Sequence, residues 1–232
     1  MSGPRIRGGK FSRSETTRAE AFSDGVFAIA VTLLVLGLHD PAHRPGGLGH
    51  ALIVQWPSYL GYFASFSYVA VIWLNHHQAF VRISGMDRGL HAANLFLLFT
   101  TGALSFPTAV VADALRADTE GTDARVAVAL YAGLAAAMCL SWVAFYQWLA
   151  RRPALLAHDV EPTYVRHGLL RSWAGALAYV LAGALGVLVT PLLALAVFGI
   201  LPVFYFVTSE GLPTAKAAHD RHVHHVHHGH HD

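Results

Sequence analysis

The first long apolar stretch of the chain reads RAEAFSDGVFAIAVTLLVLGL, from Arg18 to Leu38. From Ala21 onward nearly every residue is apolar, yet Ser23 and Asp24 stand close to its start. A helix needs about 20 apolar residues to cross the hydrocarbon core of a bilayer, and this run is long enough. An ionised carboxylate at that depth is costly unless something pairs with it, so Asp24 is a candidate functional residue.

The composition of the whole chain agrees with a membrane protein. Of the 232 residues, 54% are hydrophobic and only 13% are charged, about half the charged share of a typical soluble domain. The mean hydropathy is +0.44. The formal net charge of +2 is too small to indicate a nucleic-acid partner. Cys139 is the only cysteine, which rules out an intrachain disulfide and a zinc site of paired cysteines.

Six segments are apolar and long enough to span a membrane, and turn-rich connections separate them. They are 19–38, 51–74, 89–112, 124–149, 167–189 and 192–209. Only Thr190 and Pro191 separate the last two, which predicts a tight hairpin; a single long bent helix is the alternative. The expected fold class is therefore an all-α membrane protein with six transmembrane helices per chain.

Basic residues are distributed unevenly between the two sides of the predicted membrane. One side carries Arg44, Arg116 and Arg125, the last two among acidic residues. The other side carries the remaining Lys and Arg residues, namely Arg5, Arg7, Lys10, Arg13, Arg18, Arg82, Arg88, Arg151, Arg152, Arg166, Arg171, Lys216 and Arg221. Because cytoplasmic loops carry the excess of Lys and Arg, we expect a multi-pass protein of the plasma membrane with both termini in the cytoplasm.

The first span has two distinct faces. Successive residues of an α-helix turn by about 100°, so Ile29, Leu33 and Leu36 share one face and Thr32 lies beside them. Asp24, five residues before Ile29, lies about 140° away. If the Ile29 face meets water, the carboxylate points into protein, where it must find a partner.

The candidate partners of Asp24 lie in YVAVIWLNHHQAF, at the end of the second span. Trp73, Asn75, His76 and His77 reach the membrane surface at the depth where the first span begins. Antiparallel packing of the two spans would bring them to the carboxylate, and both an indole N–H and an imidazole can donate to it.

Two more polar residues lie at this depth. Asn94 enters the third span there, and Arg18 is six residues before Asp24, off its face, so we expect Arg18 to reach another helix. Three interpretations of the cluster stay open. It locks three helices together; it binds a metal through Asp24, His76 and His77; or it relays or senses protons. Adjacent histidines on a helix point about 100° apart, which weakens the metal interpretation.

The residues at the head of the first span resemble a known signature. Arg18, three further residues and Phe22-Ser23-Asp24, running into GVFAIAVTLLVL, are similar to the motif of the transmembrane protein 175 family of potassium channels. This family occurs in lysosomes and, as shorter homologues, in bacteria and archaea. The likeness continues with WLNHH and with NLFLLFTTGALSFPT in the third span. The last three spans agree by hydropathy alone.

The resemblance implies a homotetramer of six-span chains, with the first helix of each lining a central pore. The TVGYG carbonyl filter of ordinary potassium channels does not occur in the sequence. By analogy with the family, Ile29 forms the narrowest ring, with Leu33 and Leu36 at further apolar positions, and Thr32 adds a hydroxyl layer that helps selectivity. Potassium would be the permeant ion, and no cofactor is implied.

The resemblance also implies that polar residues hold the pore helix in place. We expect this network to comprise Arg18, Phe22, Ser23, Asp24, Trp73, Asn75, His76, His77 and Asn94.

The function expected from these observations is a potassium-permeable cation channel. A narrow apolar ring excludes water and must dilate to conduct, which is gating by dewetting. The main rival is a proton- or metal-coupled transporter that uses Asp24, His76, His77 and a His-rich tail. An enzyme is not expected, because neither a nucleophile–base pair nor an H-E-x-x-H motif is found.

The ends of the chain differ from its middle. We expect a basic cytoplasmic arm over 1–17, a channel domain over 18–210 and a His-rich cytoplasmic tail over 211–232. His-rich tracts bind metals loosely, and no more specific metal site is expected. The candidate ligands in the tail are His224, His225, His227, His228, His230 and His231.

Overall fold

The computed structural model describes residues 9–161 and 163–207, and within this part the regular elements are helices. The all-α class is therefore confirmed. The elements are α1 (Gly9–Leu34), η1 (Val35–Gly37), α2 (Leu48–Val54), α3 (Trp56–Val81), α4 (Arg88–Ala103), α5 (Ser105–Ala117), α6 (Thr122–Arg151), η2 (Pro153–Leu155), α7 (Thr163–Leu188) and α8 (Pro191–Val207).

Four stretches of the described chain are long and apolar enough to cross a membrane. They are Glu15–Gly37, Arg88–Ala117, Thr122–Arg151 and Thr163–Leu188. The shorter α8 is also apolar. Helix α3 has 26 residues, but its Ser, Tyr, Trp and His residues lower its hydropathy.

Helix boundaries depart from the predicted spans where local chemistry decides them. Helix α1 begins at Gly9, inside the arm predicted over 1–17, because the polar residues that follow are tolerated in a helix. The predicted span 51–74 is two helices: α3 starts beside Pro57, which favours a first helical turn, and runs on to Val81. The tail predicted over 211–232 lies outside the described residues.

The predicted span 89–112 is also broken, at Leu104 between α4 and α5. Pro107 explains the position, because a proline lacks the N–H for the carbonyl four residues earlier and its ring clashes there. The carbonyl in question belongs to Ala103, the last residue of α4. The hydroxyl of Thr108 donates to the carbonyl of Leu104 at 2.7 Å and so supports the break.

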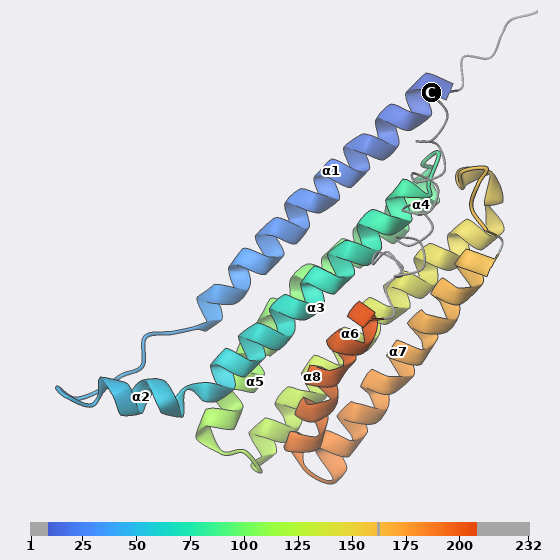
Figure 1. Ribbon diagram of the computed structural model, residues 1–232. Helices are drawn as coiled ribbons and strands as arrows, with labels where there is room; N and C mark the ends of the chain where they lie inside the picture. Colours follow the sequence, from blue (N-terminus) through green and yellow to red (C-terminus); the bar gives the residue numbers. More distant parts are fainter. Residues whose placement is uncertain (1–8, 162, 208–232) are drawn as a thin grey trace, which may run out of the picture.

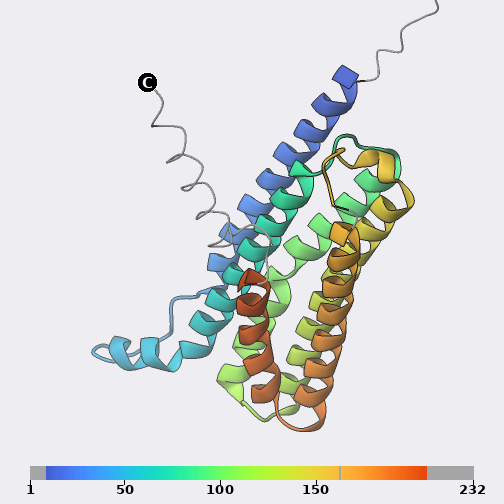
Figure 2. The same ribbon diagram turned by 45° about the vertical axis from the view of Figure 1, so that its right-hand side comes forward.

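The helices form a bundle around α6, with α1 along one edge (Figures 1 and 2). Helix α6 packs against α4, α5, α7 and α8, whereas α1 packs against α3, α4 and α5. Helices α7 and α8 lie antiparallel and are separated by Val189 and Thr190, so the predicted hairpin is confirmed and the single bent helix is not observed.

Small residues let the helices around α6 approach closely. A Cβ at Gly183 would come within 2.6 Å of the Cβ of Ala132 on α6, and one at Gly186 within 2.7 Å of Ala194 on α8. Close approach through small residues is a common way to pack helices in membranes, where apolar lipid gives no hydrophobic drive between them.

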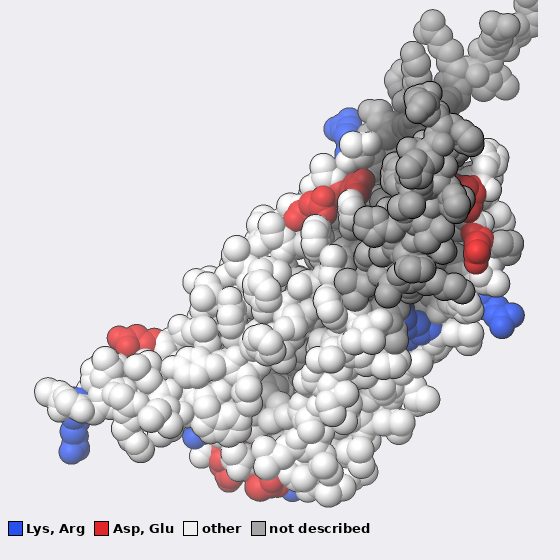
Figure 3. All heavy atoms as spheres, in the orientation of Figure 1, with Lys and Arg blue, Asp and Glu red and all other residues white. Residues whose placement is uncertain are grey.

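The two ends of the bundle differ in charge. At one end the loop 82–87 after α3 meets the connection after α6, where the N–H of Ser84 donates to the carbonyl of Leu155 at 2.8 Å. We call this the basic end, because Arg82, Arg88, Arg151 and Arg152 lie in or beside these connections. The opposite end, with α2 and the α7–α8 hairpin, is the acidic end. In the view of Figure 3 the charged atoms lie toward these ends, with a broad uncharged band between them.

Asp87 starts α4 at the basic end. Its carboxylate accepts hydrogen bonds from the N–H of Leu90 and from Nε1 of Trp148, both at 2.8 Å. Burial acts to raise the pKa of Asp87, but these two hydrogen bonds and the charge of Arg152 outweigh it, so the pKa lies below its ordinary value. Gly89 leaves room for the indole, since a Cβ there would lie 1.9 Å from the Trp148 ring.

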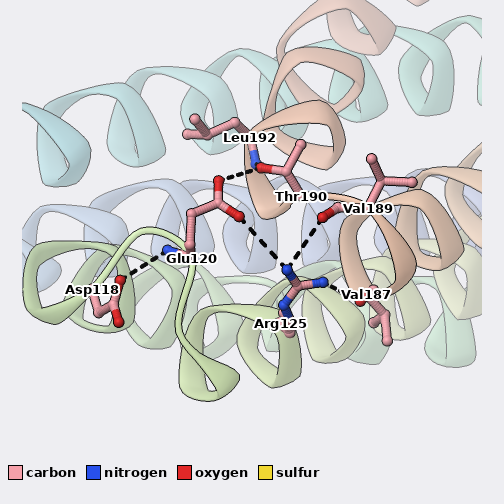
Figure 4. A network of polar contacts seen from close by, with 7 residues as sticks. All are labelled: Asp118, Glu120, Arg125, Val187, Val189, Thr190 and Leu192. Carbon is pink, nitrogen blue, oxygen red and sulfur yellow. Dashed lines mark hydrogen bonds and ion pairs between the residues drawn. The ribbon is translucent and has the colours of Figure 1, made fainter.

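Arg125 joins the α5–α6 loop to the α7–α8 hairpin at the acidic end (Figure 4). Its guanidinium donates to the carbonyl oxygens of Val187 and Val189 at the end of α7, the latter at 3.2 Å, and lies 3.7 Å from Glu120. Glu120 in turn accepts a hydrogen bond from the hydroxyl of Thr190. One side chain therefore satisfies carbonyls that a helix end leaves unpaired and ties the α5–α6 loop to the hairpin.

Replacing Arg125 by Ala should lower the free energy of unfolding by about 1 kcal/mol, since two carbonyls lose their donor in a partly exposed site. Thermal unfolding of the purified protein in detergent measures this. Arg125→Lys should restore part of the loss, because it keeps the charge without the fork of donors. Arg116→Ala, which removes a pair within α5, is the control and should change little. Equal effects at positions 125 and 116 would contradict the assignment.

Candidate functional site

One face of α1 packs into the bundle. Ala19, Ser23, Phe27, Ala30 and Leu34 are buried at intervals of three or four residues, the spacing of one helical face. Helices α3, α4 and α5 supply the opposing surface.

The opposite face of α1 is free and apolar. Ile29 and Leu33 of α1 are 60% and 45% exposed, and Leu36, in the 3-10 turn η1 that continues α1, is 67% exposed. Thr32 is exposed beside them, and its hydroxyl donates to the carbonyl of Ile29 at 2.9 Å. Phe22, seven residues before Ile29 and hence on the same face, is 57% exposed. A single chain thus presents a stripe of large apolar side chains along its edge.

Asp24 turns away from this stripe toward α3. Its carboxylate accepts a hydrogen bond from Nε1 of Trp73 at 2.9 Å. The indole also stacks on His77, with ring centroids 6.2 Å apart. Of the four candidate partners in α3, the tryptophan is the one that contacts the acid directly.

A second, fully buried chain of hydrogen bonds joins α1, α3 and α4. The amide oxygen of Asn94 lies 2.8 Å from Nε2 of His76, and its amide nitrogen donates to the Ser23 hydroxyl at 3.0 Å. Ser23 donates onward to the carbonyl of Ala19 at 2.8 Å. Asn94 therefore bridges two helices that do not follow one another in the sequence.

Aromatic rings enclose His76. Phe80 stacks on its imidazole at 4.3 Å between centroids, and Phe27 of α1 meets it edge-on at 5.1 Å. These contacts fix the ring in the bundle, so that it faces Asn94 rather than Asp24.

Two ionisable partners were missed by sequence reasoning. Nδ1 of His77 lies 3.0 Å from a carboxylate oxygen of Glu20, and Nη2 of Arg171 donates to the amide oxygen of Asn75 at 3.1 Å. Glu20 stands four residues before Asp24 and therefore lies on the same side of α1. This spacing could have identified Glu20 as a second acid facing α3. Arg171 is one of several basic residues at the same depth, and nothing in the sequence singles it out.

Two residues of the predicted network lie outside it. The exposed ring of Phe22 belongs to the free face. Arg18 is exposed as well. It lines a hollow of about 360 Å³ with His91 and Leu95 of α4, so it does face another helix.

The two adjacent histidines point to different partners, as their angular separation predicts. Nowhere in the described part of the chain do three or more His, Cys, Asp or Glu side chains come together to hold a metal ion. The histidines of the tail lie beyond those residues.

Replacing Asp24 by Ala should lower the free energy of unfolding by about 1 to 2 kcal/mol, because the Trp73 N–H loses an ionised acceptor in a partly exposed site. Asp24→Asn keeps an acceptor oxygen and should cost less. Thermal unfolding in detergent, with the amount of assembled protein, is the measurement. Wild-type stability in Asp24→Ala combined with an altered ion preference would instead place the carboxylate in the permeation path.

The fold and this site together define a class: a helical membrane protein whose first helix is anchored by polar groups on one face and bears an apolar stripe on the other. Residues 18–104 match the family model described as endosomal/lysosomal potassium channel TMEM175. A potassium channel of Streptomyces collinus is 41% identical over 206 residues, which is 88% of this chain and 98% of that protein. The chain belongs to the TMEM175 family, and the resemblance seen in the sequence is confirmed.

Other relatives agree with this assignment. The crystal structure of a homologue from Chamaesiphon minutus, described as a lysosomal potassium-selective channel TMEM175 homologue, superposes with a TM-score of 0.74 at 34% identity. The match covers 85% of this chain and 99% of that one. The human endosomal/lysosomal proton channel TMEM175 is 38% identical over 96 residues, but these are only 19% of that larger protein.

Proposed function

We propose that this chain forms a potassium channel whose pore is lined by α1. The observation that carries the proposal is the two-sided character of α1. Its packed face is held by Ser23 and Asp24, while its free face carries exposed Ile29 and Leu33, and η1, which continues it, carries exposed Leu36. The family relatives named as potassium channels support the same reading.

The proposed assembly is a homotetramer of six-span chains, with α3 and α8 completing the set of spans. In this assembly the apolar stripes of the four chains face one another across a common axis, so that together they line the pore. Both termini would face the cytoplasm of a plasma-membrane protein, because the Arg-rich basic end belongs on that side. The ion is driven by its own gradient, so no cofactor takes part.

The proposed constriction is the ring formed by Ile29, with Leu33 and Leu36 as further apolar rings. Such rings offer no oxygen to replace the hydration shell of an ion, so conduction requires them to dilate and admit water. Potassium sheds its water more easily than sodium. We therefore propose modest selectivity from dehydration, with Thr32 hydroxyls helping.

The polar groups behind α1 are proposed to position it rather than to touch the ion. Asp24 and Ser23 connect α1 to α3 and α4, and neither shares the Ile29 face. This arrangement supports a channel over a proton- or metal-coupled transporter, which would need these groups in the transport path.

Flux into proteoliposomes tests the proposal. The purified protein should carry potassium down a gradient faster than sodium, and empty liposomes serve as the control. A tetramer in detergent would support the assembly. A monomeric protein that moves neither ion would contradict the channel. So would a protein that moves potassium only when a proton or metal gradient drives the transport.

A further inference from the structure

An apolar cavity of about 240 Å³ lies between α3, α5, α6 and α8. None of its described lining residues is charged. Three of the lining side chains are large, apolar and mostly exposed: Leu60 and Phe63 of α3 at 58% and 70%, and Val203 of α8 at 61%. In a membrane-spanning bundle such side chains face lipid, so a molecule that enters the cavity between them comes from the membrane.

Three buried hydroxyl groups stand together in the wall of this cavity. Ser65 of α3, Thr108 of α5 and Tyr131 of α6 all line it, and they are 1%, 8% and 5% exposed. Each of them lies nine residues from the end of its own helix at the acidic end, which is about 14 Å along the helix axis. In a hydrocarbon core about 30 Å thick, this depth is far below the lipid headgroups.

The hydrogen bonds among these hydroxyls have a definite direction. Thr108 uses its proton on the carbonyl of Leu104, 2.7 Å away. The Ser65 hydroxyl, 2.7 Å from Oγ1 of Thr108, is therefore the donor in that pair and has only a lone pair left for Tyr131. The distance from Ser65 Oγ to the Tyr131 oxygen is 3.4 Å, whereas a hydroxyl hydrogen bond is normally about 2.5–3.0 Å long. The O–H of Tyr131 can thus still donate to a closer acceptor.

An aromatic ring lies beside this donor. Phe198 of α8 also lines the cavity, and its ring centroid is 4.6 Å from that of Tyr131. A further aromatic ring can pack against such a pair in an offset or edge-on arrangement. Apolar walls with one well-placed polar group are typical of small-molecule sites. A carboxylate or phosphate would find no cation in the described lining, so the fitting ligand is neutral.

We propose that this cavity binds a neutral, lipid-soluble aromatic ketone. The carbonyl oxygen of the ligand accepts a hydrogen bond from the hydroxyl of Tyr131, and its aromatic ring packs on Phe198. The acyl chains of bulk lipid carry no acceptor at this depth, because their ester groups lie at the membrane surface. The described lining comes from α3, α5, α6 and α8 rather than from α1, so the site depends on neither the pore nor the ion proposed above.

Photolabelling of the full-length protein in neutral detergent tests the site. Benzophenone is an aromatic ketone that inserts into neighbouring C–H bonds under near-ultraviolet light, and it should label the parts of α3 and α8 that line the cavity. Mass spectrometry of the peptides maps the label. Fluorenone and fluorene then compete with benzophenone; they have nearly the same shape, but only fluorenone carries a carbonyl. Fluorenone should protect the wild type at an about fivefold lower concentration, the ratio expected for one hydrogen bond.

Tyr131→Phe removes the proposed donor and keeps the ring. Because the Tyr131 hydroxyl makes only a long contact with Ser65, this variant should keep the thermal stability of the wild type. Fluorenone and fluorene should protect it at equal concentrations, while the protection by fluorene stays as in the wild type. A merely structural role of Tyr131 would not change the ratio of the two competitors.

Two glycine substitutions test the location of the site. Gly199 lines the cavity, and a Cβ added there would meet nothing within 4 Å. Gly199→Leu should therefore fill the space and abolish the labelling while the protein stays folded. Gly133 on α6 has equally open surroundings but does not line the cavity. Gly133→Leu is thus the matched control and should be labelled like the wild type.

Several outcomes would overturn the proposal. Equal protection of the wild type by fluorene and fluorenone would show a pocket that takes acyl chains without using its hydroxyl. A preference for fluorenone that persists in folded Tyr131→Phe would assign the carbonyl to another donor. Wild-type labelling of Gly199→Leu, or an equal loss of label in Gly133→Leu, would place benzophenone elsewhere. Labelling that neither competitor reduces would show nonspecific partition of the probe.

Discussion

Ile29→Asn is expected to give larger currents and a lower preference for potassium over sodium, with assembly preserved. Ile29 is 60% exposed on the free face of α1, so an amide there meets no packed neighbour in the chain. Around the proposed pore, one amide from each subunit would wet the narrowest ring and supply oxygens that suit sodium as readily as potassium. Lowering the barrier by only ~1.4 kcal/mol raises flux about tenfold.

Bi-ionic reversal potentials in potassium and sodium measure the change. The permeability ratio should fall toward one, and Leu33→Asn should act in the same direction more weakly if the pore widens away from Ile29. Phe27→Asn is the control on the packed face. Phe27 is 2% exposed, so that variant should damage folding rather than selectivity.

A direct test of position uses a cysteine at residue 29. In a background where Cys139 is replaced by Ala, a pore-borne thiol reagent should modify Ile29→Cys and block the current. An unreactive cysteine together with an unchanged reversal potential in Ile29→Asn would show that another surface carries the ion.

Asn94→Ala is expected to cost the most stability of the substitutions behind α1, about 3 kcal/mol. Asn94, His76 and Ser23 are 2%, 0% and 0% exposed. Without the amide, Nε2 of His76 loses its partner, and Nδ1 has none among the described residues. An orphaned buried polar group costs about 1–3 kcal/mol, and the cavity left by the side chain adds to it.

The comparison variant for Asn94 is Asn75→Ala. Asn75 is only partly buried, and one of its hydrogen bonds goes to the carbonyl of Val71 in its own helix, so its loss should cost less. Thermal unfolding and the yield of assembled protein in detergent are the measurements. Reversal potentials of the surviving Asn94→Ala channels should stay at the wild-type value. A wild-type unfolding temperature in Asn94→Ala would show that the bridge does not anchor α1.

The helical class and the two faces of α1 follow from the sequence because they depend on neighbours along one chain segment. A period of about 3.6 residues places Ile29 and Leu33 together and Asp24 elsewhere, whatever surrounds the helix. The boundaries were predicted less well. The break at Leu104 comes from Pro107 within an apolar run, which hydropathy alone passes over.

The pairing of the polar residues was not predictable in the same way. The sequence placed Trp73, His76 and Asn94 at the depth of Asp24, because the depth of a residue depends only on its position within its own span. Which of them contacts the carboxylate depends on how α3 and α4 rotate about their axes, and the packing of Phe27 and Phe80 on His76 decides it. For the same reason Glu20 emerged as a partner of His77 only in the folded chain.

The sequence by itself determined an all-helical chain, a first helix with one polar and one apolar side, and the family to which its signature belongs. Each of these depends on residues that are close together in the sequence, through the helical periodicity and a contiguous motif. Only the tertiary structure decided that Trp73 holds Asp24 and that Asn94 joins His76 to Ser23. These features depend on the rotation and register of helices far apart in the sequence, which packing of the whole bundle sets.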